Sequence, residues 1–160
     1  GTGMSCHSCL LRPKSLGEIT LESADPFADP LIDPKFLSHP DDMKDMVDGY
    51  KIMMKVLACE PFSKYISEHT QRPIDINDDA DIEQAMREGA DTVYHPVGTC
   101  KMGNDDMSVV DSRLKVHKVN GLRVVDASIM PTIVGGNTNA PTIMIGEKAS
   151  DMILEDWSIH

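Results

Sequence analysis

A histidine in the segment YHPVGT (94–99) is the residue of this chain best suited to acid–base chemistry. His95 directly precedes Pro96, which pushes the backbone of the residue before it toward an extended conformation, and Gly98 lets the chain fold back closely. Because imidazole exchanges a proton near neutral pH, a histidine held on such a loop could act as a general base. From these residues alone, a purely structural histidine stays open as the alternative.

A second candidate site is the segment GGNTNAP (135–141), which precedes a helical pattern. Its two glycines permit close backbone approach, and its two asparagines supply amide donors and acceptors. The helix that follows presents unpaired N–H groups at its N-terminus. This set of groups suits a polar or anionic ligand. The alternative is an asparagine cap that begins the helix after a flexible turn.

Two of the four cysteines, Cys6 and Cys9, form a C-x-x-C with His7 between them. A structural zinc site needs four ligands, usually from two such pairs, whereas Cys59 and Cys100 are isolated in the sequence. In a strand, residues three apart point to opposite faces of the sheet. We therefore expect ordinary strand residues and no metal. A metal site on this C-x-x-C and its histidine is the weaker alternative.

Other classes of function are disfavoured by missing motifs and by charge. None of G-x-G-x-x-G, G-x-x-x-x-G-K-[ST] and H-E-x-x-H occurs in the 160 residues, so no dinucleotide or triphosphate cradle is expected. The 26 acidic and 15 basic residues give a net charge of −11, which argues against nucleic acid or an anionic membrane as partner. No apolar run approaches the ~18 residues of a membrane span. Few, irregularly spaced cysteines favour a reducing cytoplasm.

In the first half of the chain, turn residues and periodicity predict two strands and two helices. Residues 4–12 and 18–22 are expected as strands on either side of a turn. Four prolines in 24–40 predict a loop. Apolar residues at three- and four-residue spacing predict a helix over 40–59, capped by Ser38 and with Pro40 in its first turn. A shorter helix is expected over 80–88, ending at Gly89.

The second half is predicted to contain short strands and one helix. Residues 91–102 begin as a strand and continue as a loop, and 114–116 and 122–125 are expected to pair across Asn120-Gly121. A loop over 126–139 leads into a helix from Ala140 to Asp156. Mixed strands and segregated helices predict the α+β class. The residues expected on the buried face of this helix are Ile145, Ala149, Met152 and Ile153.

Three ordered segments resemble the C-terminal part of the glucose–methanol–choline (GMC) oxidoreductases, a family of FAD-dependent alcohol oxidases and dehydrogenases. They are YHPVGTCKMG (94–103), VVDSRLKVHKVNGLRVVDASIMP (109–131) and GGNTNAPTIMIGEKASDMI (135–153). Residues 11–37 also resemble the start of that family's substrate domain. The likeness covers nearly the whole chain, and the choline-dehydrogenase-like bacterial branch is nearest.

The resemblance implies a role for each of five residues. His95 falls where the family has its catalytic histidine, which accepts the alcohol proton while a hydride passes to the flavin. Asn137 falls on the second active-site position, which is His or Asn in the family, and would hydrogen-bond the substrate oxygen. Asp126 and Ala127 match a segment whose backbone approaches the flavin, and Asn139 matches a position beside the isoalloxazine ring.

The resemblance also implies a fold and a domain division. It implies an antiparallel sheet with flanking helices, in which 1–125 belong to the substrate-binding domain and 126–160 return to the FAD domain. That FAD domain is absent from this sequence, and the chain begins with glycine. We therefore expect one part of a longer or split FAD-dependent alcohol dehydrogenase or oxidase, inactive alone and not able to hold FAD by itself.

The expected partners are a small alcohol, the missing FAD domain or a chain that supplies it, and further copies of this chain. Copies are expected because, without the FAD domain, the apolar faces that the family packs against it would be exposed. Such faces on two copies of the chain would then pack against each other. The alternative from another class is a non-catalytic binding or self-associating module derived from the same fold.

Overall fold

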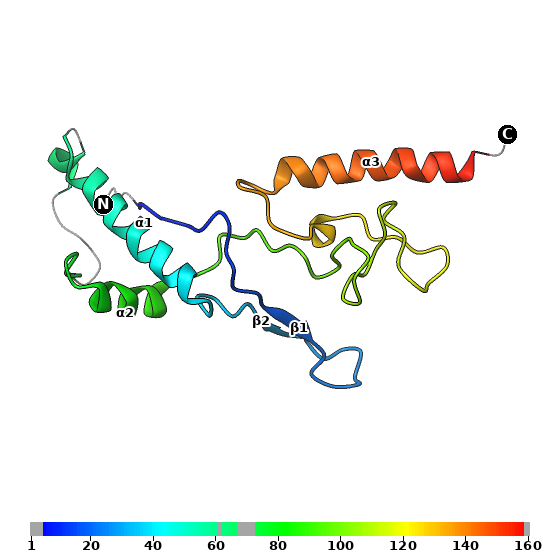
Figure 1. Ribbon diagram of the computed structural model, residues 1–160, viewed down its shortest axis with the longest axis horizontal. Coiled ribbons are helices and arrows are strands. Elements are labelled where there is room, and N and C mark those ends of the chain that lie inside the picture. The colour runs from blue at the N-terminus through cyan, green and yellow to red at the C-terminus, as the bar shows by residue number, and fades with distance from the viewer. Residues whose placement is uncertain (1–4, 61, 67–72, 159–160) are drawn as a thin grey trace. The chain divides into compact units, whose positions relative to one another are not determined.

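The computed structural model describes residues 5–60, 62–66 and 73–158 (Figure 1). The chain divides into two compact units, 1–93 and 94–160, and each is described by itself. Strands and helices occur together, which confirms the α+β class, and no helix of the described residues is long and apolar enough to cross a membrane. In chain order the elements are β1 (Glu18–Thr20), β2 (Leu31–Asp33), α1 (Pro40–Ala58), η1 (Ser63–Tyr65), α2 (Asp79–Gly89), η2 (Ala127–Ile129) and α3 (Asn139–Trp157).

Helices α1 and α2 pack against each other in the first unit (Figure 1). Met43, Val47 and Tyr50 are buried on one face of α1 and meet Ile82 of α2, which has no exposed surface. The three- and four-residue spacing of these side chains is what makes α1 amphipathic. Both predicted helices are confirmed, and their observed ends lie within one residue of the predicted ones.

The predicted ends of these helices need small corrections. The N-cap of α1 is His39 and not Ser38, because Pro40 already occupies the first helical turn and the residue before it takes the cap position. His39 Nδ1 accepts the backbone N–H of Asp41 at 3.2 Å. Gly89 is the last residue of α2, and the cap is the next residue, whose N–H bonds the carbonyl of Met86.

A buried carboxylate in the first turn of α1 holds the segment that precedes β1. Asp42 is 2% exposed, and its oxygens accept the backbone N–H groups of Lys14 at 2.9 Å and Ser15 at 2.7 Å and the Ser15 hydroxyl at 2.6 Å. Burial opposes ionisation, but these hydrogen bonds outweigh it and hold the pKa of Asp42 below its usual value. The turn predicted before β1 is therefore fixed by α1.

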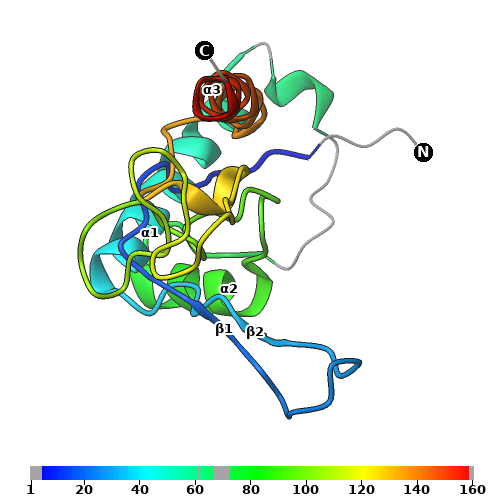
Figure 2. The ribbon, with the colours of Figure 1, turned by 90° about the vertical axis from the view of Figure 1, so that its right-hand side faces the viewer.

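The strand pairing differs from the predicted one. β1 pairs antiparallel with β2 through three residue pairs, with Ile19 opposite Ile32 (Figure 2). β2 lies inside the proline-rich segment predicted as a loop, because prolines at 30 and 34 bracket three residues that remain free to pair. Gly17 makes the approach possible, since a Cβ there would lie 2.3 Å from the Asp33 carbonyl oxygen. Residues 5–12 form no strand, and residue 4 of the predicted strand lies outside the described residues.

The second unit is a helix packed on irregular loops. α3 contacts η2, which lies beneath it in Figure 1. The predicted final helix is confirmed; of its four predicted inward residues, Ile145 and Ala149 are buried, Met152 is half-buried and Ile153 is exposed. The buried residues of this unit, called core 2 below, are Val110, Leu114, Ile129, Met130, Ile145 and Ala149.

The predicted strands of this unit are replaced by isolated bridges. Residues 91–102 form no strand, and 114–116 meet 122–125 only through a Lys115–Arg123 bridge. The turn at Asn120-Gly121 is present, and Gly121 has the positive φ of 75° that such turns need. Positive φ at Leu114 and Lys118 bends the chain, so the ladder cannot extend into strands.

Candidate active site

Backbone conformation fixes the direction in which His95 leaves its loop. The preceding residue, Tyr94, has φ 63°, a left-handed conformation that is uncommon outside glycine. Pro96 restricts the backbone of His95 from the other side. Gly98 has φ 91°, and a Cβ on it would lie 3.4 Å from the Met130 carbonyl oxygen. The loop around the histidine is thus bent sharply on both sides and held close to neighbouring backbone.

The loop after His95 is attached to η2. The N–H of Cys100 donates to the Ser128 carbonyl at 3.0 Å, and the N–H of Met102 donates to the Ile129 carbonyl at 2.8 Å. Asp126, predicted to contact a flavin, is exposed at its side chain and caps η2 by accepting the N–H of Ser128 at 2.7 Å. Ala127 packs against core 2. Both residues therefore help to hold η2, to whose carbonyls the loop after His95 is hydrogen-bonded.

His95 contacts the loop that leads into α3. Its Nδ1 lies 2.9 Å from Thr138 Oγ1. The imidazole is half-buried and Thr138 is 9% exposed. Asn137 and Asn139, the other two predicted residues of this loop, flank Thr138 in the sequence and are exposed. The structure thus joins the two segments that the sequence singles out, 94–99 and 135–141.

Two sets of polar groups at this place have no hydrogen-bond partner among the described residues. One is Nε2 of His95, and the other is the side-chain amides of Asn137 and Asn139. Gly136, beside them, has no atom other than those of its chain neighbours within 4 Å of where a Cβ would stand. A molecule approaching this loop would find an imidazole nitrogen, two amides and open backbone. Such groups can accept a proton from a hydroxyl and hydrogen-bond its oxygen.

Thr138 is the functional candidate that sequence reasoning misses. It is the N-cap residue of α3, and its carbonyl accepts both the N–H of Thr142 at 3.0 Å and the Thr142 hydroxyl at 2.7 Å. A threonine between two asparagines at a helix start is ordinarily assigned as a cap. Only the contact with His95, 43 residues earlier, distinguishes it.

The exposed groups of this loop fit one edge of a flavin but not its pyrophosphate. The amides of Asn137 and Asn139 and the open backbone at Gly136 could approach a polar ring edge. The sequence contains no glycine-rich phosphate cradle. The residues present therefore suit contacts to the ring of the cofactor and leave its phosphates to other protein groups.

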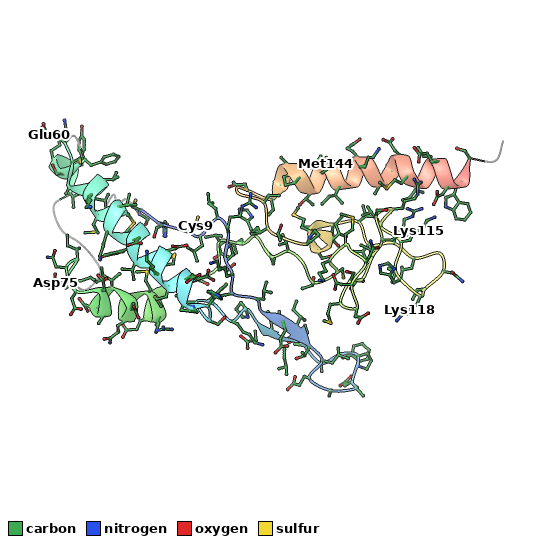
Figure 3. The ribbon with its side chains drawn as sticks, viewed as in Figure 1. Cys9, Glu60, Asp75, Lys115, Lys118 and Met144 are labelled. Atoms are coloured by element: carbon green, nitrogen blue, oxygen red, sulfur yellow. The ribbon has the colours of Figure 1, made fainter. Side chains whose placement is uncertain are left out.

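The C-x-x-C segment has no ligand-like arrangement. Cys6, His7 and Cys9 are exposed, and both cysteines are free. Figure 3 labels Cys9. Within 5–60, 62–66 and 73–158, no group of three or more His, Cys, Asp or Glu side chains could hold a metal ion.

An ion-pair cluster holds the far end of α3 to the loops of the same unit. Asp156 Oδ1 lies 2.9 Å from the guanidinium of Arg113, and its Oδ2 lies 2.5 Å from Lys115 Nζ. Asp156 also forms an ion pair with Arg123. Figure 3 shows Lys115 beside the C-terminal half of α3. The hydrogen bond from Lys115, opposed by burial and aided by the charge of Arg113, lowers the pKa of Asp156 to about 2.

Replacing Asp156 with asparagine should destabilise the second unit in a pH-dependent way. Because folding lowers the pKa, the contribution is fully present above the ordinary value of 3.8 and is lost as the pH falls through about 2. Urea unfolding followed by circular dichroism should show a lower midpoint than wild type at neutral pH and a much smaller difference near pH 2, where about half of the Asp156 side chains are protonated. Asp151→Asn, an exposed change on the same helix, is the control. Equal midpoints for Asp156→Asn and wild type at neutral pH would contradict the assignment.

Comparison with known sequences decides the family. The family model for the C-terminal part of the GMC oxidoreductases matches residues 13–146. The chain belongs to the GMC oxidoreductase family. It is 48% identical over 154 residues to an alcohol dehydrogenase [acceptor] of Pseudomonas putida, covering 96% of this chain and 28% of that protein. It is 42% identical over 151 residues to an oxygen-dependent choline dehydrogenase of Escherichia coli K12, covering 94% and 27%.

Solved structures of larger proteins share the fold of this chain. A formate oxidase of Aspergillus oryzae superposes with a TM-score of 0.88 at 33% identity, over 92% of this chain and 26% of that one. An FAD-dependent oxidoreductase of Chaetomium thermophilum superposes with a TM-score of 0.82 at 26% identity, over 90% and 25%. This chain spans about a quarter of the length of the proteins that it matches.

Proposed function

We propose that this chain is the substrate side of an FAD-dependent enzyme that oxidises a small alcohol, and that His95 is its general base. The observation that carries the proposal is the state of the imidazole. One ring nitrogen is held by Thr138, and Nε2 has no hydrogen-bond partner among the described residues. The names of the alcohol and choline dehydrogenases that resemble this chain support a CH–OH substrate.

The chemistry requires a base and a hydride acceptor. Oxidation of an alcohol to a carbonyl removes a hydride from carbon and a proton from oxygen. FAD, when bound, supplies the acceptor for the hydride. A hydride leaves an alkoxide-like carbon more readily than a neutral alcohol, so His95 Nε2 takes the hydroxyl proton as or before the hydride departs. The amide of Asn137 donates a hydrogen bond to the same oxygen and orients it.

The remaining residues act as supports for the cofactor. Asn139 and the backbone of Asp126 and Ala127 would contact the flavin, and residues 126–160 would return to the FAD domain. The chain alone would be inactive and would not retain FAD, because it has no pyrophosphate cradle. An FAD domain in the same or a second polypeptide completes the site. We assign this enzyme to the cytoplasm on its cysteine usage.

A chimera tests this proposal. The chain replaces the matching segment of the Pseudomonas putida alcohol dehydrogenase, of which it covers 28%. The chimera is expected to purify with FAD and to be reduced by an alcohol that reduces the parent enzyme. A folded chimera that holds FAD stoichiometrically, yet is reduced by none of the alcohols that reduce the parent, would refute it.

One observation favours a second candidate, a non-catalytic self-associating module. Several large apolar side chains of α3 are exposed, and Figure 3 shows one of them, Met144. Exposed apolar patches mark interaction surfaces. Flavin separates the two candidates: a module would self-associate in sedimentation and acquire no FAD in the chimera. The exposed apolar residues of α3 are Ile143, Met144, Ile153, Leu154 and Trp157.

A further inference from the structure

We propose that Thr138 is a positioning residue that keeps the proton of the neutral His95 ring on Nδ1, so that Nε2 is the nitrogen that accepts a proton. The tautomer itself is a property of this chain alone. Its catalytic meaning rests on the proposed function. Thr138 would then act only through His95.

The contact has ordinary hydrogen-bond length, and Thr138 is buried. Nδ1 and Oγ1 are 2.9 Å apart, and Thr138 is 9% exposed. A buried polar group that lacks a hydrogen bond costs free energy, because water cannot replace the missing partner. The Thr138 hydroxyl and the ring nitrogen are therefore expected to bond each other. The carbonyl of Thr138 is held by two bonds from Thr142, so the hydroxyl stands on a fixed backbone.

The three α-helices of the described residues differ in how their cap side chains are used. In α1 the side chain of the cap residue His39 accepts a helix N–H, and in α2 Asp78 does the same. In α3 the cap residue Thr138 makes no such bond. Its hydroxyl oxygen is therefore not occupied by the helix, and its lone pairs are available to an N–H from the ring of His95.

Only one direction of this hydrogen bond yields a base. If Nδ1–H donates to Thr138, the neutral ring carries its lone pair on Nε2, which then can accept the alcohol proton. If the hydroxyl donated to Nδ1, the ring proton would sit on Nε2 and block it. Nε2 is the nitrogen without a partner among the described residues, so it is the one that a substrate can reach.

Nitrogen NMR on the chain itself tests the tautomer. With ¹⁵N-labelled histidine at about pH 8.5, where imidazole is neutral, the His95 signals are identified by their loss in His95→Gln. We expect protonated Nδ1 and unprotonated Nε2 in wild type. Thr138→Val should shift the ring toward protonated Nε2, and Thr138→Ser should keep the wild-type spectrum. Thr132→Val, an exposed change on the same loop, is the matched control and should change nothing.

Two results would overturn the inference: protonated Nε2 in wild type, or a Thr138→Val spectrum identical to wild type. The wild-type spectrum decides even if Thr138→Val fails to fold. In the chimera, Thr138→Val should reduce the flavin about tenfold more slowly and Thr138→Ser within about twofold of wild type. An inactive chimera with the expected tautomer in the chain would reject the proposed function and leave the positioning role supported.

Discussion

His95→Ala in the chimera is expected to lower the rate of flavin reduction by an alcohol by ~10²–10⁴-fold while FAD stays bound. That factor corresponds to roughly 3–5 kcal/mol of barrier, the usual contribution of a positioned general base. The loss arises because the hydroxyl proton has no acceptor when the hydride must leave. Anaerobic stopped-flow absorbance measures the reduction step separately from reoxidation.

Two further variants make this result specific. Asn137→Ala should cost less than His95→Ala, because it removes a hydrogen-bond donor and leaves the proton acceptor in place. His117→Ala removes another half-buried histidine of the same unit, whose Nε2 lies 3.0 Å from the Gly103 carbonyl oxygen. It should reduce the flavin at nearly the wild-type rate. A loss in His117→Ala as large as that in His95→Ala would point to general destabilisation.

Ile145→Ala is expected to destabilise the second unit by about 2–5 kcal/mol, the range for removing a buried isoleucine side chain. Ile145 is 7% exposed and belongs to core 2, where α3 meets the loops around Val110 and Ile129. Its loss leaves a cavity under the first half of α3, the helix that carries Thr138. We therefore expect faster opening of the helix that presents Thr138 to His95.

Hydrogen exchange on the isolated chain measures this opening along α3. Met144→Ala is the matched control, because Met144 is the preceding residue and its side chain is exposed (Figure 3). Its exchange should stay close to wild type. Equal exchange for Ile145→Ala and Met144→Ala would mean that α3 is not held by core 2.

The helices could be predicted from sequence because their signals are local. Met43, Val47 and Tyr50 repeat at helical spacing, and Pro40 marks the start of α1. Of the strands, β1 could be predicted within 18–22, but its partner could not, because pairing depends on distant residues. β2 is short and bracketed by prolines, and nothing near it in sequence shows that β1 is its partner. The pairing predicted across Asn120-Gly121 stops at a single Lys115–Arg123 bridge, because Leu114 and Lys118 adopt positive φ.

The same distinction applies to the candidate site. His95 and Asn137 are accessible to sequence reasoning because each lies in a long, ordered motif. The role proposed for Thr138 depends on a contact across 43 residues and on a cap bond that α3 lacks. Asp42 is similar, since its acidic side chain at a helix start suggests a solvated residue, and only the fold brings Lys14 and Ser15 to it.

Chemical rescue tests most directly whether the reaction needs a proton acceptor at His95. In the His95→Ala chimera, added imidazole should raise the rate of alcohol-dependent flavin reduction in proportion to its concentration, because it restores the base that the variant lacks. The Asn137→Ala chimera, which keeps its histidine, should show no such rise. If the His95→Ala chimera instead reduces its flavin at nearly the wild-type rate, with or without imidazole, His95 is structural and the proposed mechanism is wrong.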